Sequence, residues 1–173
     1  MSAEWYKEQP KNRNFLNPIG YLLKLEKFDG TDFFCQTANI PDISMPTTEI
    51  ASQFRNLPII PGGGVEFGDF SVRFIVDEDL INYNSIYSWM RDNGNADQMQ
   101  RMTLEKDIYT SAQLHIVTSQ YNPAFIVDFR NIFPVSLSSL QFDATMTDVE
   151  YITADVTFKH QQFFLCDKNL KPL

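Results

Sequence analysis

The sequence holds few of the residues that staple a small protein or anchor it in a bilayer. Only two of its 173 residues are cysteines, Cys35 and Cys166, and they form no C-x-x-C pair. We therefore expect two reduced, buried thiols rather than a disulfide. No apolar run approaches the roughly 18 residues that a bilayer-spanning helix needs. A chain of this length buries about 70% of its unfolded surface, so it can fold as one domain without a disulfide or a metal.

Basic charge is also scarce. The chain has 14 Lys and Arg against 22 Asp and Glu, which gives a formal net charge of -8. Proteins that hold nucleic acid by neutralising phosphates show a basic stripe, and this sequence has none. The charge therefore argues against tight binding of DNA or of an anionic membrane surface. Residues 1–14 lack the apolar core of a signal peptide, so we expect the chain to remain in the cytoplasm where it is made.

Motifs that carry catalysis or bind cofactors are missing as well. Pro61–Gly64 leads into a strand pattern and lacks the Gly-Lys-Ser/Thr of a phosphate-binding loop. The two histidines, His115 and His160, lie on separate strand patterns with no carboxylate or cysteine at metal-ligand spacing. Cys35 lies in an apolar run, and no Gly-x-Ser-x-Gly motif occurs. We therefore expect no catalytic residue, no cofactor and no metal, and a protein that is not an enzyme.

Aromatic residues and alternating apolar residues are what the sequence does have. Aromatics make up 14% of the chain and 15 residues are Phe, which favours a well-filled core or apolar contacts between subunits. Apolar and polar residues alternate, as in strands buried on one face, over 20–26, 32–38, 65–76, 110–118, 124–129, 140–142 and 152–159. An Asp-Gly turn signal predicts that the first two form a hairpin.

These strands predict the fold class. Phenylalanines at strand spacing are expected in the core: Phe70, Phe74, Phe125, Phe129, Phe142 and Phe158. Six or seven strands with mostly local connections predict a mainly β protein. We expect an antiparallel β-barrel or sandwich with one flanking α-helix and long loops.

The flanking helix is expected over 80–91. The residues of its apolar face recur at spacings of three and four: Leu80, Tyr83, Ile86, Tyr87 and Met90. Asp77, Glu78 and Asp79 precede the helix, where negative charge stabilises the positive end of its dipole, and Asn93-Gly94 provides a C-terminal stop. The three carboxylates lack the alternation and central Gly of a calcium loop, so we expect them to cap the helix.

The composition also predicts the domain organisation. Residues 1–18 are polar and form an N-terminal arm that is ordered only when something receives it. Residues 19–165 form one domain, followed by a C-terminal tail over 166–173. Within the domain, 39–64 is a long loop rich in Pro and Gly that allows only short or edge strands, and 95–107 is a polar insertion. The apolar residues of 39–64 indicate that this loop packs against something.

Three segments carry motifs in a fixed order. The first is Tyr21–Glu26 running into Phe33–Pro41, an opening hairpin that ends in an apolar residue and proline. The second, 65–90, holds a strand, an Asp-Glu pair and a helix that ends in Trp-Met. The third, 131–158, holds a Phe-Pro corner, a Leu before an acidic turn and a closing strand. Together they resemble the tail tube proteins of contractile-tailed bacteriophages, which are related to the tube protein of the type VI secretion system.

The resemblance implies a β-barrel subunit that assembles as hexameric rings, which stack into a tube for genome passage. It implies several partners: other copies of the chain, a tail sheath protein and baseplate or terminator proteins, with DNA only as passing cargo and no membrane. It places the protein in the virion tail, made in the host cytoplasm. The candidates for subunit contacts lie in 1–18 and 39–64: Trp5, Tyr6, Phe15, Leu16, Ile43, Met45, Phe54, Leu57, Ile59 and Ile60. The candidates for facing the sheath are Asp77, Glu78 and Asp79.

Two other functions remain open at the level of sequence. A single tube-like ring at one end of the tail, such as a baseplate initiator or a terminator, has the same sequence features as a main tube subunit. A small-ligand-binding β-barrel would instead be a monomer with a roomy apolar interior. The acidic excess is compatible with DNA as cargo, because carboxylates lining a channel would repel phosphates over a Debye length of about 8 Å.

Overall fold

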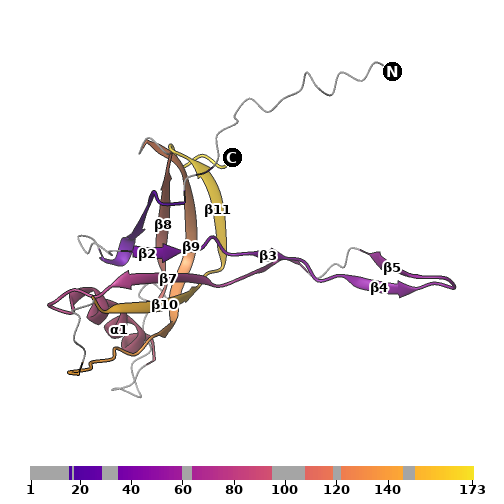
Figure 1. Cartoon of the computed structure of the whole chain (residues 1–173). Helices are drawn as coiled ribbons and strands as arrows, with labels where there is room; N and C mark the ends of the chain where they lie inside the picture. The colour runs from indigo at the N-terminus through magenta and orange to yellow at the C-terminus, as the bar shows by residue number, and fades with distance from the viewer. Residues whose placement is uncertain are drawn as a thin grey trace.

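The chain forms a barrel-like body with a narrow two-stranded arm that projects from it (Figure 1). The computed structural model describes residues 16, 18–28, 35–59, 64–94, 108–118, 122–145 and 151–173. Within these residues the elements are β1 (Tyr21–Leu25), η1 (Glu26–Phe28), β2 (Cys35–Ala38), β3 (Ile43–Ser44), β4 (Thr48–Ala51), β5 (Asn56–Ile59), β6 (Glu66–Phe67), β7 (Phe70–Ile75), α1 (Ile81–Asn93), β8 (Thr110–Val117), β9 (Pro123–Leu137), β10 (Thr153–Lys159) and β11 (Gln162–Asp167).

Seven strands form the sheet of the body, and all of their pairs are antiparallel. The order is β1-β8-β9-β10-β7-β2, and β11 also pairs with β9. The expectation of a mainly β fold with six or seven antiparallel strands and one flanking helix is confirmed.

The 15-residue strand β9 joins the two halves of this sheet. Its first part pairs with β8 and β11, and its last part pairs with β10. Asn131 has a positive φ of 53° where β9 passes from one set of partners to the other. The expected corner at Phe133-Pro134 is therefore wrong, because both residues lie inside a continuous strand and pair with β10.

The expected hairpin between the first two strands is also wrong. β1 pairs with β8, and β2 pairs with β7. The Tyr21 hydroxyl of β1 donates a hydrogen bond to the carbonyl oxygen of Cys35 on β2 at 3.3 Å. Each strand buries its apolar face against a partner distant in sequence, and this packing outweighs the local Asp-Gly turn signal.

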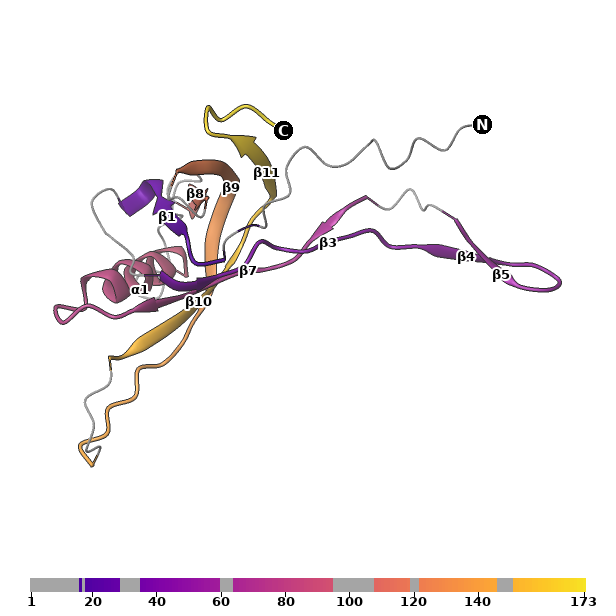
Figure 2. The ribbon, with the colours of Figure 1, turned by 45° about the horizontal axis from the view of Figure 1, so that its top comes forward.

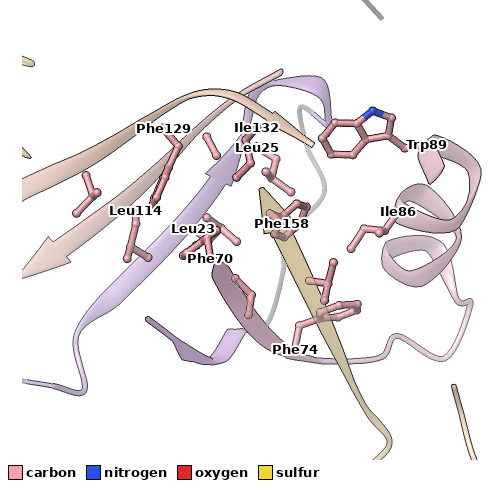
Figure 3. Packing of buried hydrophobic residues seen from close by; sticks show 14 of the residues in the cluster. Leu23, Leu25, Phe70, Phe74, Ile86, Trp89, Leu114, Phe129, Ile132 and Phe158 are labelled. Atoms are coloured by element: carbon pink, nitrogen blue, oxygen red, sulfur yellow. The ribbon is translucent and has the colours of Figure 1, made fainter. Parts of the chain in front are cut away.

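The core lies between the two halves of the sheet and α1 (Figure 3). The predicted alternation is confirmed where it is cleanest, since Phe70, Phe74, Phe129 and Phe158 are fully buried. The rings of Phe70 and Phe129 stack with their centroids 4.4 Å apart. Burial of each such side chain stabilises the fold by about 2–3 kcal/mol relative to an exposed one.

Two of the predicted core phenylalanines behave differently. Phe125 is half-buried and packs against the edge of the core. Phe142 is 77% exposed, so its assignment to the core is wrong. The strand expected over 140–142 does not form, because β9 ends at Leu137 and the chain leaves the sheet there.

The helix α1 packs across one end of the body (Figures 1 and 3). Its buried residues are Asn82, Ile86 and Trp89, while Leu80 and Tyr87, expected on the apolar face, are exposed. The difference follows from the start of the helix, since Leu80 precedes the first helical turn with a left-handed φ of 57°. The apolar face is therefore rotated toward Trp89, whose indole N–H donates to the carbonyl of Ile108 at 3.1 Å.

The acidic triplet does not cap α1 as expected. The helix has no side-chain cap, and residues 78–79 form a turn before it. Instead of a cap, the side chain of Asn82 in the first turn of the helix binds the segment before it. Its Nδ2 donates to the carbonyl of Ile75 at 2.8 Å, and its Oδ1 accepts from the backbone N–H of Asp77 at 3.3 Å. These two bonds fix the first turn of α1 to the end of β7.

The described residues of the long loop expected over 39–64, which are 39–59 and 64, belong to a two-stranded arm (Figures 1 and 2). β3 pairs with β6 near the body, and β4 pairs with β5 farther out. All of these strands have two to four residues, as the prolines of this segment allow. The arm continues past 64 to Phe67, so the loop boundary expected at 64 falls within it.

The C-terminal residues belong to the fold rather than to a free tail. Cys166 and Asp167, which the expected tail included, are the last residues of β11. The chain then turns back, and the backbone N–H of Leu173 donates to the carbonyl of Leu165 at 3.0 Å. Apolar and polar residues do not alternate along β11, because Phe163, Phe164 and Leu165 are consecutive apolar residues. The polar insertion expected over 95–107 lies outside the described residues.

Candidate assembly surfaces

The outer part of the arm is a ribbon with two different faces. Paired residues of antiparallel strands lie on the same face of a sheet. Ile50 pairs with Leu57 and Thr48 pairs with Ile59, which places the three apolar side chains on one face. Glu49 and Asn56 belong to the other face, where the Asn56 amide donates to the Glu49 carboxylate at 2.9 Å. The ribbon is therefore amphipathic, although no other described residue forms a layer over its apolar face.

Eight apolar side chains in the described part of the arm are exposed. They are Ile40, Ile43, Met45, Ile50, Phe54, Leu57, Ile59 and Val65. Phe54, at the tip, is 92% exposed, while the tip itself is held by hydrogen bonds between Ser52 and Arg55. An isolated two-stranded hairpin is at best marginally stable in water, and a contiguous exposed apolar surface marks an interaction site.

The structure places the predicted contact residues as follows. Ile43, Met45, Phe54, Leu57 and Ile59 are exposed on the arm, and Leu16 is exposed before β1. Trp5, Tyr6, Phe15 and Ile60 lie outside the described residues. Ile50 was not among the candidates, yet it shares the apolar face with Leu57. No alternation in the sequence of β4 (Thr48–Ala51) marked it, because Ala51 follows Ile50 and its face also holds the polar Thr48.

The root of the arm is anchored on the body by an aromatic cluster. The ring of Phe67 on β6 lies 5.5 Å from that of Phe163 on β11 and 5.8 Å from that of His160. The backbone N–H of Gly68 donates to the carbonyl of Asp42 at 2.9 Å, which joins the two strands of the arm. A Cβ at position 68 would meet the carboxylate of Asp42, which would have to turn aside to make room.

Among the described strands, three strands of the body have an edge that no other strand covers completely. β1 and β2 are the last strands at the two ends of the sheet order. β11 pairs with β9 on one side, and the returning C-terminal residues cover part of its other side through the Cys166–Pro172 bridge. Open strand edges present unpaired N–H and C=O groups, which are templates for pairing with another chain.

The acidic triplet lies at the other end of β7 from the arm (Figures 1 and 2). β7 has six residues, so it separates the triplet from the arm root by about 20 Å. Glu78 and Asp79 are exposed and Asp77 is half-buried. Within the described part of the chain, none of the three carboxylates forms a salt bridge. The triplet is therefore a compact patch of negative charge at the surface.

The outer face of β7 and β10 is polar, and its charges are paired. The Arg73 guanidinium makes two hydrogen bonds to the Asp155 carboxylate, at 2.7 and 3.0 Å, and these bonds lower the pKa of Asp155. Lys159 lies 3.8 Å from Asp69. Charge is thus compensated locally on this face, although the chain as a whole is strongly acidic.

Groups that could support chemistry are few in the described residues. They contain no group of three or more His, Cys, Asp or Glu side chains placed to hold a metal ion. Burial raises the pKa of the Cys35 thiol to about 12, so it is a poor nucleophile at neutral pH. Among the residues that the structure describes, no helix has the length and apolar character needed to cross a membrane.

The fold is similar to those of tube components from contractile injection systems. A chain of the PVC extracellular contractile injection system, from its sheath–tube complex, is 15% identical with a TM-score of 0.62, and the match covers 90% of this chain and 93% of that one. The tube-terminating cap of the anti-feeding prophage is 16% identical with a TM-score of 0.64, over 96% of this chain and 99% of the other. Hcp1 from Flavobacterium johnsoniae is 11% identical with a TM-score of 0.52, over 84% and 94% of the two chains. At these identities the likeness concerns the fold alone.

The family follows from the sequence. No curated protein sequence matches the chain significantly. The family model of the phage tail tube protein, however, matches residues 8–166, which is nearly the whole chain. The match includes the arm, the seven-stranded sheet and α1. The chain belongs to the phage tail tube protein family.

Proposed function

We propose that the chain is a structural, non-enzymatic subunit of a contractile tail tube, assembled as hexameric rings that stack around a channel for genome passage. The observation that carries this proposal is the amphipathic arm. Ile50, Leu57 and Ile59 form an apolar face on a ribbon that has no layer of its own chain over it among the described residues. A second copy of the chain is the occupant, because an arm that leaves one subunit and packs on the next generates a repeating assembly.

Assembly also stabilises the arm. Full burial of a large aliphatic side chain contributes about 1.5–3 kcal/mol. The three residues of the apolar face are only about half exposed, so their complete burial contributes about 2–4 kcal/mol before the cost of association. The open edges of β1 and β2 allow neighbouring subunits to continue the sheet, which removes the exposed edges from solvent. In this proposal the arm joins rings, and the strand edges close each ring.

The remaining predicted contacts belong to the same proposal. Trp5, Tyr6, Phe15 and Leu16 of the N-terminal arm, and Ile60 beside β5, contact neighbouring subunits. Asp77, Glu78 and Asp79 face basic residues of the surrounding sheath protein. Baseplate and terminator proteins are the partners at the two ends of the tube, DNA is passing cargo, and the protein is made in the host cytoplasm and resides in the virion tail.

A single ring at one end of the tail is the second candidate. It is supported by the anti-feeding prophage, whose cap has a TM-score of 0.64 and whose baseplate has a chain with a TM-score of 0.61. These values are close to that of the PVC sheath–tube complex, so the fold serves both kinds of component. The number of copies per tail separates the two roles, since a tube subunit is present in many rings and a terminal component in one.

A ligand-binding barrel has less support. Such a barrel needs a roomy interior. Here the rings of Phe70, Phe74, Phe129 and Phe158, together with Trp89, occupy the space between the sheet halves and α1 (Figure 3). This filled core favours a structural subunit.

The proposal is tested with the purified chain by negative-stain electron microscopy and light scattering. We expect rings or tubes from the natural sequence and a folded, unassembled protein from the double variant Ile50→Ser/Leu57→Ser. The matched control is Glu49→Ser/Asn56→Ser, which changes the polar face of the same two strands and should assemble. A natural chain that remains monomeric at all concentrations, or an Ile50→Ser/Leu57→Ser variant that forms normal tubes, would contradict the proposal.

A second deletion variant tests the N-terminal arm. Removing residues 1–18 should abolish tubes while leaving a folded monomer or ring, because the barrel begins at β1 (Tyr21–Leu25). Tubes of normal length from this variant would show that residues 1–18 are dispensable for assembly.

A further inference from the structure

His160 lies at the point where the arm and both halves of the sheet meet. It occupies the short connection between β10 and β11, which pair with different parts of β9. The next residue, Gln161, donates its backbone N–H to the carbonyl of Arg130 and accepts a hydrogen bond from the Asn131 amide at 2.7 Å. The connection is thus held in place by β9.

The surroundings of the imidazole are aromatic. Its centroid lies 5.3 Å from that of Phe129, 5.6 Å from that of Phe163 and 5.8 Å from that of Phe67. Phe129 belongs to the core of the body and Phe67 to the root of the arm. His160 is therefore one of the groups through which the arm is attached to the body.

Both ring nitrogens of His160 are inaccessible to solvent, and neither has a hydrogen-bond partner among the described residues. A neutral imidazole can be accommodated in such a site at moderate cost. An imidazolium has a full charge and two N–H donors, and burying these without acceptors is much more costly.

Charged groups of β9, of β10 and of the residues next to the arm root lie around this site. Asp69, next to the arm root, acts on the imidazole and favours its protonated form, but it is also paired with Lys159 of β10 at 3.8 Å. On β9, Arg130 lies over the ring of Phe164 at 4.8 Å and pairs with Asp128 at 3.6 Å. Burial is the larger effect and, against the attraction of Asp69, lowers the pKa of His160 below its ordinary value.

We propose that His160 makes the attachment of the arm pH-dependent. In its neutral form it packs with Phe67 and holds the arm root against the body. Protonation is compatible only with a state in which the imidazole reaches water, and in that state Phe67 leaves the cluster. Acidification therefore loosens the arm root, whatever the arm contacts at its outer end.

The expected size of the effect follows from the titration of the exposed imidazole. An exposed His has a pKa near 6.5, so at pH 5.5 about ten in eleven such side chains are protonated. The packed imidazole stays neutral over this range. The ratio of molecules with a loosened arm root to molecules with a packed arm root therefore rises about tenfold between pH 7.5 and 5.5. Because burial lowers the pKa of His160 in the packed state, the attachment of the arm is fully stable above pH 6.5 and weakens as the pH falls below that value.

Hydrogen–deuterium exchange on the full chain tests the proposal. After correction for intrinsic exchange rates, peptides covering 41–45 and 65–69 should lose about tenfold in protection between pH 7.5 and 5.5. His160→Phe keeps an aromatic ring without a titrating group and should abolish the change, and His160→Leu serves if the Phe variant does not fold. His115→Gln, on β8, is the matched control and should retain the full response.

Two further measurements keep the outcome independent of assembly. The exchange experiment is repeated in the Ile50→Ser/Leu57→Ser background, and an equal pH response there supports the proposal, whereas a response confined to the natural chain would assign it to assembly and overturn it. The pKa of His160 is measured by NMR in the same background, where a value at or above 6.5 would refute the proposal. Equal responses of the natural chain and His160→Phe would also overturn it.

Discussion

The substitution Asn82→Leu tests how α1 is fixed to the sheet. Asn82 is a fully buried polar residue, and its side chain makes two hydrogen bonds, to the carbonyl of Ile75 and from the backbone N–H of Asp77. Leucine has a similar volume, so the substitution removes both bonds without leaving a large cavity. The carbonyl and the N–H then remain in a half-buried position without their partners.

The magnitude follows from these two groups. A buried polar group that loses its partner costs about 1–3 kcal/mol. Ile75 and Asp77 are half-buried, so water can reach them in part and the lower end of that range applies. We expect a loss of about 2–3 kcal/mol in the free energy of unfolding. For a chain of this length the melting temperature should fall by about 4–12 °C.

The assay is thermal and urea denaturation followed by circular dichroism and Trp fluorescence, since Trp89 lies on α1. Asn84→Leu is the matched control, because Asn84 is an exposed residue of the same helix and its replacement should change stability by less than about 0.5 kcal/mol. Asn82→Asp adds a pH test: a buried carboxylate is disfavoured when charged, so this variant should lose stability relative to the natural chain as the pH rises from 4 to 8. If Asn82→Leu is as stable as Asn84→Leu, the two hydrogen bonds do not fix the helix and the reasoning fails.

Two further predictions concern the thiols and the acidic triplet. In a Cys166→Ser background at pH 8, iodoacetamide should modify Cys35 on the order of a thousandfold more slowly in the folded protein than in denaturant. The reason is that burial raises the pKa of this thiol to about 12 and leaves very little thiolate. Similar modification rates in the two states, measured by mass spectrometry, would show that the thiol is not protected. Changing Asp77, Glu78 and Asp79 together to Lys should leave tube formation intact and abolish co-assembly with the sheath protein at low salt, with salt weakening the natural interaction. Co-assembly that is unchanged at low and high salt would remove the triplet from the sheath interface.

Local patterns predicted the individual strands well, because burial of one face leaves a period of two in the sequence. The buried residues of β7, β8 and β10 alternate as expected, including Phe70, Leu114 and Phe158. The same pattern gave a wrong prediction at Phe142. Leu140 and Phe142 are two residues apart, as in a strand, but the sheet strand β9 already ends at Leu137 and Phe142 is exposed.

Such local patterns did not predict which strands pair with each other or which side chains pack together across the fold. The Asp-Gly turn signal predicted a hairpin, but β1 and β2 pair with β8 and β7 because those partners cover their apolar faces. The buried face of α1 also differs from the predicted apolar face. It includes the polar residue Asn82, because the Asn82 side chain donates a hydrogen bond to the carbonyl of Ile75 at the end of β7. Nothing in the spacing of His160 indicated that three aromatic rings from distant segments would surround it.

The candidate contacts on the arm were foreseen only in part. Composition identified the segment, because it combines prolines with many apolar residues. Which side chains share a face depends on the register of β4 with β5, and this register is visible only in the structure. It groups Ile50 with Leu57 and Ile59, whereas the sequence had suggested an undivided apolar loop.

The sheet order also has a consequence for how the chain is made. β1 can pair only after β8 has been synthesised, because Tyr21 pairs with Ile116. In the same way, β7 can pair with β10 only after residue 156 has been synthesised, because Val72 pairs with Val156. Pairings between such distant residues fold slowly, whereas the local hairpin of β4 and β5 can form within microseconds. On the ribosome the arm is therefore synthesised before the later strands of the barrel, and its apolar side chains are exposed before there is a finished subunit to receive them.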